Sequence, residues 1–155
     1  METHEFRTEE DPEYKEYDSY QYELGRKVPF IIWTKTMAGT ELNQEYSYVM
    51  GMYDVLPTLG NMFGYNNKYA LGHDIFQVRE NNIVVFPNGN WVTNNLYYNS
   101  QKAAYLSLTD QPIMEEEIAN NTDYANKLLD VSNNIIIFDL LNKDKNNDVE
   151  EKTEE

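Results

Sequence analysis

The sequence of 155 residues contains no cysteine, which excludes disulfide bonds, thiol catalysis and cysteine-based zinc sites. Its seven glycines are scattered along the chain, so no glycine-rich loop for binding phosphate is present. No apolar run approaches the roughly 18 residues of a membrane-spanning helix. The acidic start is unlike a secretory signal peptide, and there is no lipidation motif. The sequence therefore predicts no targeting signal of its own.

Basic residues are also scarce. There are 12 Lys and Arg against 27 Asp and Glu, a formal net charge of -15. Because nucleic-acid phosphates require clustered basic side chains, no nucleic-acid partner is expected. Nine acids fall in residues 1–24 and seven in residues 139–155. We therefore expect an acidic, partly disordered lead-in over residues 1–24, one domain over residues 25–141, and an acidic disordered tail over residues 142–155.

Among the features that are present, residues 48–64 are the most informative, because a strand pattern there gives way to a short capped helix. Asp54 is predicted to be the N-cap, accepting from free amides two or three residues on. Pro57 falls in the first turn, where its missing N–H costs nothing, and Thr58 is interpreted as a capping or packing residue. Gly64 suits a left-handed C-cap. Spacings of three and four residues predict one apolar helix face, made of Leu56, Leu59, Met62 and Phe63.

Two apolar runs, residues 28–34 and 46–53, predict strands of a central sheet, since a strand buried on both faces is almost continuously apolar. Further along, turn signals predict an antiparallel meander of three strands, at residues 82–86, 91–98 and 103–108.

A long C-terminal helix is predicted over residues 113–141. Glu115, Glu116 and Glu117 favour a helix start, and apolar residues recur after them at helical spacing, although local preference at residues 135–138 also suits a strand. The helix would cover the meander, because such a unit needs a cover for its apolar face. The predicted fold class is α/β.

The segment Asp54-Val55-Leu56-Pro57-Thr58-Leu59 resembles the Asp-x-x-Pro-Thr-Leu segment of the sulfatase branch of the alkaline-phosphatase superfamily, and most of all its lipoteichoic-acid-synthase-like group of bacterial cell-envelope enzymes. Three further segments fit in the same order. They are Arg-Lys-Val-Pro-Phe-Ile-Ile-Trp (26–33), Tyr-Ala-Leu-Gly-His-Asp-Ile-Phe (69–76) and Val-Val-Phe-Pro-Asn-Gly-Asn-Trp-Val-Thr (84–93). The resemblance extends over residues 14–141 and implies the C-terminal portion of an alkaline-phosphatase-like domain.

The resemblance also implies a metal-dependent phosphoglycerol transferase, in which a Thr nucleophile attacks the phosphatidylglycerol headgroup and passes glycerol phosphate to a growing polymer. A divalent metal such as manganese would serve the intact enzyme. The nucleophile, a Glu and the Asp-His pair of the metal site would all precede residue 14. We therefore expect a fragment without catalytic residues or metal ligands, inactive alone, whose partner is the missing N-terminal part of the same domain. An intact enzyme would be membrane-anchored, with an extracellular domain.

Four other groups are candidates for chemistry. His73 and Asp74 are an adjacent His/carboxylate pair, but metals such as zinc and manganese need three or more convergent ligands. We interpret His73 as a loop residue that bonds neighbouring backbone. His4 is interpreted as a solvated side chain. The acidic runs Glu9-Glu10-Asp11 and Glu115-Glu116-Glu117 match no EF-hand spacing.

Aromatic residues leave an alternative open. Trp33, Trp91 and the 13 tyrosines could form a surface on which saccharides or glycerol-phosphate polymers stack, although strand packing also favours aromatic residues. A non-catalytic module that binds envelope polymers is therefore one alternative function, and a fragment of a sulfuric ester hydrolase is another. The state of residues 28–34 discriminates between a fragment and a free-standing module, because a module would cover this apolar run.

Overall fold

The computed structural model describes residues 19–25, 27–33 and 43–143. These belong to two compact units, Met1–Asn43 and Gln44–Glu155. In the first unit, Ser19–Leu24 forms helix α1, within the segment where the sequence predicts a partly disordered lead-in. Residues 28–33 form no strand, so the strand predicted there is wrong. His4, the acidic run at residues 9–11 and the tail from residue 144 lie outside the described residues.

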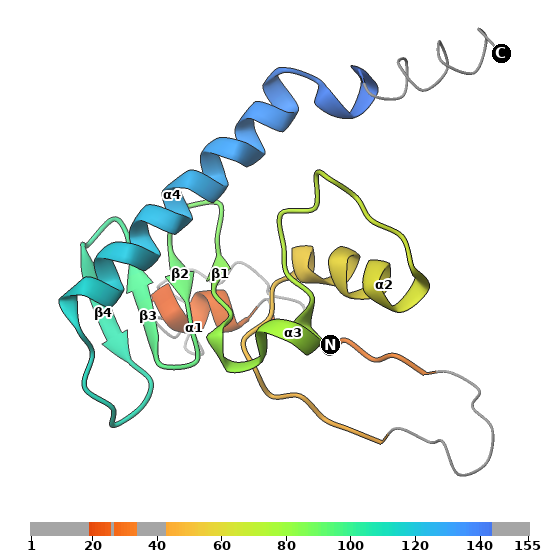
Figure 1. The fold of residues 1–155 in the computed structure, drawn as a ribbon. Helices are drawn as coiled ribbons and strands as arrows, with labels where there is room; N and C mark the ends of the chain where they lie inside the picture. Colours follow the sequence, from red (N-terminus) through yellow and green to blue (C-terminus); the bar gives the residue numbers. More distant parts are fainter. Residues whose placement is uncertain (1–18, 26, 34–42, 144–155) are drawn as a thin grey trace, which may run out of the picture. The chain divides into compact units, whose positions relative to one another are not determined.

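The second unit begins with helical elements. A 3-10 helix, η1 (Met52–Asp54), leads into α2 (Val55–Phe63), and α3 (Ile75–Val78) is followed by a second 3-10 helix, η2 (Arg79–Asn81) (Figure 1). Four strands and the long helix α4 (Glu115–Ile137) complete it. The architecture is mixed α/β with an antiparallel sheet and a long C-terminal helix, as predicted.

The sheet has four strands rather than three, paired in the order β1-β2-β3-β4. They are β1 (Val84–Val85), β2 (Trp91–Val92), β3 (Leu96–Asn99) and β4 (Ala104–Ser107). The single strand predicted over residues 91–98 folds back on itself, pairing Val92 with Tyr97. Thr93 closes the turn, because its side chain accepts from the amides of Asn95 and Leu96, each at 3.2 Å.

The missed signal for this hairpin is the pair Asn94-Asn95, since asparagine tolerates the backbone of tight two-residue turns. By contrast, the turn between β1 and β2 is as predicted. Gly89 takes a φ of 84° there, and the amide of Phe86 donates to the carbonyl of Asn90 at 2.8 Å.

The strand predicted over residues 46–53 is also wrong. Residues 43–51 pair with no strand, and at Val49 side-chain amides take the bonds that a neighbouring strand would provide. The amide of Val49 donates to Asn94 Oδ1 at 2.9 Å, and its carbonyl accepts from Asn82 Nδ2 at 3.0 Å. The chain then turns into η1.

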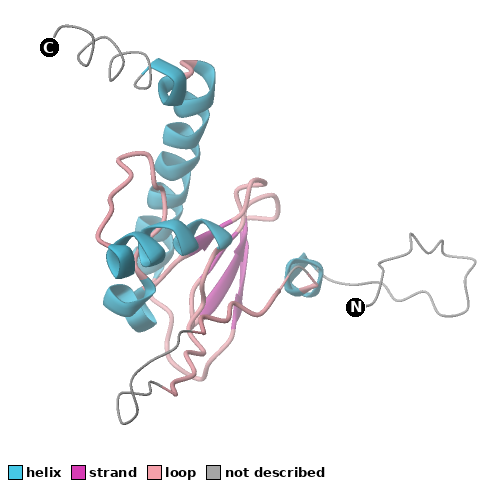
Figure 2. Ribbon diagram, turned by 90° about the vertical axis from the view of Figure 1, so that its right-hand side faces the viewer, coloured by secondary structure: helices cyan, strands magenta, loops and turns pink. Residues whose placement is uncertain are grey.

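Helix α4 lies along one face of the sheet (Figures 1 and 2). The core between them contains Ile83, Val85, Trp91, Leu96 and Ala125, and α4 adds partly buried side chains that include Tyr124 and Leu128. The predicted cover for the meander is thereby confirmed. The helix ends at Ile137, shortly before the predicted residue 141, and Asp139 follows in the left-handed region with a φ of 49°.

Candidate functional site

Asp54 is the centre of the most highly organised polar cluster in the second unit. Its side chain is 1% exposed and accepts three hydrogen bonds. The amide of Gly51 donates to Oδ2 at 2.8 Å, the amide of His73 donates to Oδ1 at 2.9 Å, and Asn82 Nδ2 donates to Oδ2 at 2.8 Å. One carboxylate therefore joins three segments that are far apart in the sequence.

The predicted role of Asp54 as side-chain N-cap of α2 is wrong. Asp54 does precede α2, but its side chain makes no capping bond to that helix. The carboxylate instead satisfies more distant donors, and its bond to Gly51 closes the first turn of η1. Charge-assisted bonds of this kind are stronger than neutral ones, which explains how a buried carboxylate is stabilised without a basic partner among these donors.

Thr58 connects helix α2 to the start of α3 through hydrogen bonds of its buried side chain. Its side chain is 0% exposed. Its hydroxyl donates to the carbonyl of Asp54 at 2.6 Å and accepts from the amide of Ile75 at 3.2 Å. The helix therefore binds the start of α3 through a hydroxyl. Pro57 lies in the first turn of α2, and Gly64 ends that helix with a φ of 73°.

Tyr53 connects the cluster to the sheet. Its hydroxyl accepts from the amide of Val85 at 2.8 Å and donates to the carbonyl of Ile83 at 3.3 Å. Burial raises the pKa of the Tyr53 hydroxyl, and the negative charge of Asp54 adds to the increase, while the bond from Val85 opposes it. The neutral phenol is therefore the form that this site holds.

His73 faces helix α4. Its ring stacks on Tyr124 with 6.2 Å between the centroids, and His73 Nε2 lies 3.4 Å from the Tyr124 hydroxyl. Burial raises the pKa of the Tyr124 hydroxyl, with a smaller increase from the charge of Asp54. Asp74, by contrast, caps α3 by accepting from the amide of Phe76 at 3.0 Å. The prediction that the His73 side chain bonds neighbouring backbone is therefore wrong, because its ring contacts Tyr124 of α4 and its Nδ1 atom has no hydrogen-bond partner.

The bonds of this cluster connect several elements of the second unit. The Asp54 oxygens already accept three bonds and are shielded from solvent, so they offer no accessible base. Two buried atoms, His73 Nδ1 and Asn82 Oδ1, have no hydrogen-bond partner. Among the residues that the structure describes, no group of three or more His, Cys, Asp or Glu could hold a metal ion. The divalent metal that the resemblance implies therefore has no matching ligand set in this part of the chain.

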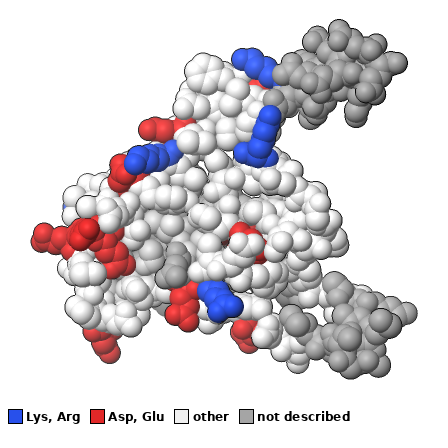
Figure 3. All heavy atoms as spheres, viewed as in Figure 1, with Lys and Arg blue, Asp and Glu red and all other residues white. Residues whose placement is uncertain are grey.

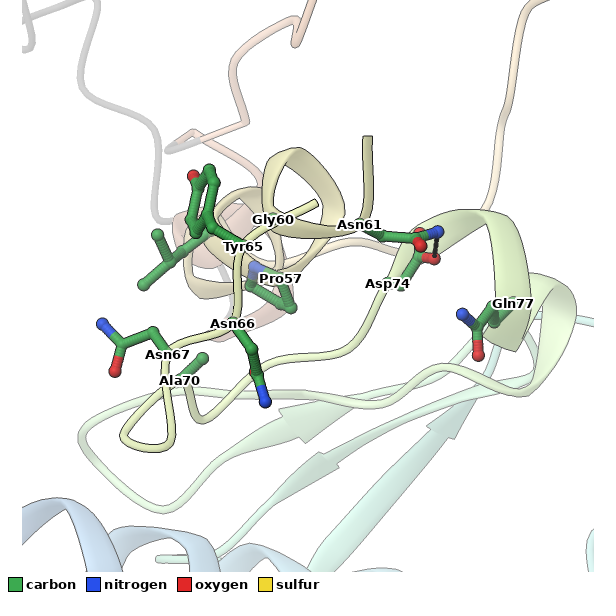
Figure 4. A pocket seen from close by; sticks show the side chains of 10 residues that line it. Pro57, Gly60, Asn61, Tyr65, Asn66, Asn67, Ala70, Asp74 and Gln77 are labelled. Atoms are coloured by element: carbon green, nitrogen blue, oxygen red, sulfur yellow. Dashed lines mark hydrogen bonds between the residues drawn. The ribbon is translucent and has the colours of Figure 1, made fainter. Parts of the chain in front are cut away.

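A shallow pocket of about 270 Å³ lies between α2 and α3. Figure 4 shows its amide side chains, which include Asn61, Asn66 and Gln77. Asn61 already donates to Asp74 Oδ2 at 2.5 Å. The rim of the pocket is therefore polar, and the Asp74 carboxylate on this rim already accepts a hydrogen bond from Asn61.

The two tryptophans behave in opposite ways. Trp91 is 0% exposed, stacks on Tyr98 at 5.3 Å and donates to Thr122 Oγ1 at 3.3 Å. A sugar-stacking surface at Trp91 is therefore excluded. Trp33, in the first unit, is 83% exposed.

Sequence reasoning identified the segment around Asp54 but missed Tyr53, Asn82 and Tyr124 as its partners. No local pattern marks these residues, because each reaches the cluster from a different element. Gly72, which precedes His73, gives one usable sequence signal for the close approach of this loop to Asp54. A Cβ there would lie 2.6 Å from Asp54 Oδ1, so only glycine allows the loop to approach so closely.

No protein-family model matches the sequence. Curated relatives do match it. The chain is 31% identical over 137 residues to lipoteichoic acid synthase 1 of Bacillus subtilis (strain 168). The aligned region covers 86% of this chain and 21% of that protein. It is also 31% identical, over 111 residues, to the lipoteichoic acid synthases of Staphylococcus aureus strains USA300 and NCTC 8325. That match covers 69% of this chain and 17% of each of those proteins. The chain thus spans about a fifth of the length of these relatives, and the resemblance seen in the sequence is confirmed at moderate identity.

Proposed function

We propose that this chain, which is lipoteichoic-acid-synthase-like over most of its length, is the C-terminal scaffold of a metal-dependent phosphoglycerol transferase of the cell envelope. In this proposal the nucleophile and the metal ligands lie in another part of the enzyme. The chain supplies packing surfaces and the rigid Asp54 cluster, and is inactive alone.

The observation that carries this proposal is the state of residues 28–33. This apolar run has the composition of a buried strand, but it pairs with no strand and exposes large side chains, with Ile31 at 80% and Trp33 at 83%. Contiguous exposed apolar residues mark interaction surfaces. A free-standing module would cover such a run, whereas part of a larger domain leaves it open for a neighbouring strand.

The described side chains also support a scaffold role. Phosphoglycerol transfer needs an activated hydroxyl and a metal that stabilises phosphoryl charge. The hydroxyl of Thr58 is fully engaged within the protein and Asp54 is inaccessible. Neither side chain can therefore reach a phosphodiester.

The proposed location is the outer side of the cell membrane, as part of an anchored enzyme that acts on phosphatidylglycerol or on a glycerol-phosphate polymer. Within the described ranges, no helix has the length and hydrophobicity of a bilayer span.

The alternative of a module that binds envelope polymers loses its main support, because Trp91 is buried in the core. A sulfuric ester hydrolase fragment would share the same scaffold, and the curated relatives favour phosphoglycerol transfer, since those named here are lipoteichoic acid synthases.

The test is a transfer assay in two arms. The purified chain is incubated with phosphatidylglycerol vesicles and Mn²⁺, and the release of diacylglycerol is measured. We expect no release above the protein-free control. The second arm uses the polypeptides encoded by the DNA on either side of this coding segment, expressed together with the chain. Release in the second arm alone supports the proposal. Release by the chain alone, or flanking DNA that encodes no synthase-like sequence, would overturn it.

A further inference from the structure

Strand β4 forms an open edge of the sheet. It is the last strand in the order β1-β2-β3-β4 (Figure 1), and all four of its residues are exposed, with Tyr105 at 54% and Leu106 at 44%. Natural proteins protect long-lived edges with charged residues, proline or bulges, because an open edge can pair with another chain. Residues 103–109 contain no Asp, Glu, Lys, Arg or Pro, so β4 itself carries none of these protecting residues.

The backbone groups that β4 leaves free can be identified from its pairing with β3. In an antiparallel pair, only every second residue exchanges hydrogen bonds with the strand opposite it. The amide of Leu108 donates to the carbonyl of Asn95 at 2.8 Å, so Leu106, two residues earlier, also bonds β3. The N–H and C=O groups of Tyr105 and Ser107 therefore point away from β3, and no other backbone bond of these two residues occurs in the described part of the chain.

The charges that flank β4 are placed symmetrically. From residue 81 to residue 114, the only charged residues in the sequence are Lys102 and Asp110, which lie four positions before and four positions after Leu106. Both side chains are exposed, and neither forms an ion pair with any residue that the structure describes. Because an antiparallel copy runs in the opposite direction, a two-fold axis at Leu106 would set each lysine across from an aspartate.

We propose that β4 is a self-association edge, at which two copies of this chain pair their β4 strands antiparallel about a two-fold axis at Leu106. This register joins the free backbone groups of Tyr105 in each copy to those of Ser107 in the other, about four hydrogen bonds in all. The two Leu106 side chains face each other as an apolar cross-strand pair, and Lys102 of each copy lies across from Asp110 of the other. A shift by two residues in either direction keeps backbone bonding but loses this charge match, so the charges select the register.

Charge also explains why two copies would meet at this edge. The net charge of -15 opposes self-association, because like charges repel, and Figure 3 shows acidic side chains in several separate groups on the face viewed. A contact between copies therefore requires a neutral segment, and residues 103–109 are neutral and are flanked by charges of opposite sign. Pairing at β4 would join two four-stranded sheets into one continuous sheet. Self-association goes beyond the proposed scaffold role and does not depend on it.

The experiment is sedimentation velocity of the purified full chain over a range of concentrations. Lys102→Glu and Asp110→Lys are measured separately and as a double variant that exchanges the two charges. Lys127→Glu is the matched control, because it changes the net charge as Lys102→Glu does but lies on the exposed side of α4. Ser107→Pro removes a backbone N–H that points away from β3, a position at which an edge strand tolerates proline. Circular dichroism checks that each variant is folded.

We expect the parent chain to sediment as a monomer of 18.3 kDa at low concentration and as a dimer at high concentration. Lys102→Glu and Asp110→Lys each set like charges opposite each other twice in the dimer, so each should weaken it by about tenfold or more. Asp110→Lys should do so although it lowers the net negative charge. The double variant should regain the parent affinity, Lys127→Glu should keep it, and Ser107→Pro should remain monomeric.

A parent chain that stays monomeric at every concentration overturns the proposal. So does a dimer that persists in folded Ser107→Pro, a double variant as weak as the single ones, or a Lys127→Glu variant that loses as much affinity as Lys102→Glu. The charge variants lie outside the strand, so they decide the question even if Ser107→Pro fails to fold. None of these outcomes bears on the transfer assay, which tests the proposed function by itself.

Discussion

Replacing Asp54 by asparagine tests whether one buried carboxylate holds the second unit together. The substitution keeps the size of the side chain but exchanges one acceptor oxygen for an NH₂ group. Each carboxylate oxygen accepts from at least one donor, namely His73 N on Oδ1 and both Gly51 N and Asn82 Nδ2 on Oδ2. Whichever way the amide is oriented, a donor will therefore face a donor.

The expected magnitude follows from these bonds. A buried donor left without a partner costs about 1–3 kcal/mol, and the remaining bonds to Asp54 lose their charge assistance, worth about 1 kcal/mol each. Removing the buried charge offsets part of this loss. We expect the free energy of unfolding to fall by about 2–4 kcal/mol, a large fraction of the about 5–15 kcal/mol typical of a domain.

The assay is urea unfolding followed by tryptophan fluorescence in a Trp33→Phe background, which leaves the buried Trp91 as the reporter. With a denaturant slope of about 1–3 kcal/mol/M, the midpoint is expected to fall by about 1–2 M. Asp123→Asn is the matched control, because Asp123 pairs with Lys127 on the exposed side of α4 and such pairs contribute about 0–1 kcal/mol. If Asp54→Asn unfolds at the same urea concentration as Asp123→Asn, the assigned role of the carboxylate is refuted.

Three further substitutions test the contacts around this cluster. Tyr53→Phe removes a hydroxyl that bonds two backbone groups and should destabilise by about 1–3 kcal/mol, whereas Tyr105→Phe on the exposed strand β4 should have almost no effect in the same unfolding assay. Because burial raises the pKa of Tyr53 in the folded state, the folded protein keeps a proton that the unfolded chain loses above about pH 10. Stability should therefore fall as the pH rises beyond 10, and a pH series in which Tyr53→Phe declines as steeply as the parent would contradict this origin. Thr58→Val keeps the shape of the side chain but loses both hydrogen bonds, so the free energy of unfolding should fall by about 1–3 kcal/mol. Thr58→Ser should recover most of this loss. Equal stability of the two variants in thermal unfolding would exclude the hydroxyl as the cause. Gly72→Ala places a Cβ 2.6 Å from Asp54 Oδ1 and should lower the melting temperature by several degrees, since a small domain loses roughly 4–8 °C per kcal/mol of stability. An unchanged melting temperature would show that the loop can move away from Asp54.

Local signals in the sequence were sufficient for much of the second unit. The class, the helix from Val55 to Phe63 with Gly64 at its end, and the long helix over the sheet were predicted from capping residues and apolar spacing. The extra hairpin was missed because a pair of asparagines, rather than a glycine, forms its turn.

The predicted strands at residues 28–34 and 46–53 failed for a different reason. A strand exists only when another strand satisfies its backbone groups. The described residues 28–33 have no such neighbour, and Val49 bonds side chains of Asn82 and Asn94 instead. Strand propensity alone could not reveal either outcome, because both depend on residues far away in the sequence.

The sequence by itself determined the α/β class, the capped helix, the acidity and the resemblance to lipoteichoic acid synthases, since all of these depend on composition and on short-range spacing. Only the tertiary structure decided that the Asp54 side chain binds distant donors rather than its own helix, and that Leu56, Met62 and Phe63 of α2 are exposed. The physical reason is that the direction of a buried carboxylate or of a helix face is set by whichever long-range partners satisfy its hydrogen bonds. Here those partners are His73 and Asn82 for Asp54, and Ile75 for Thr58.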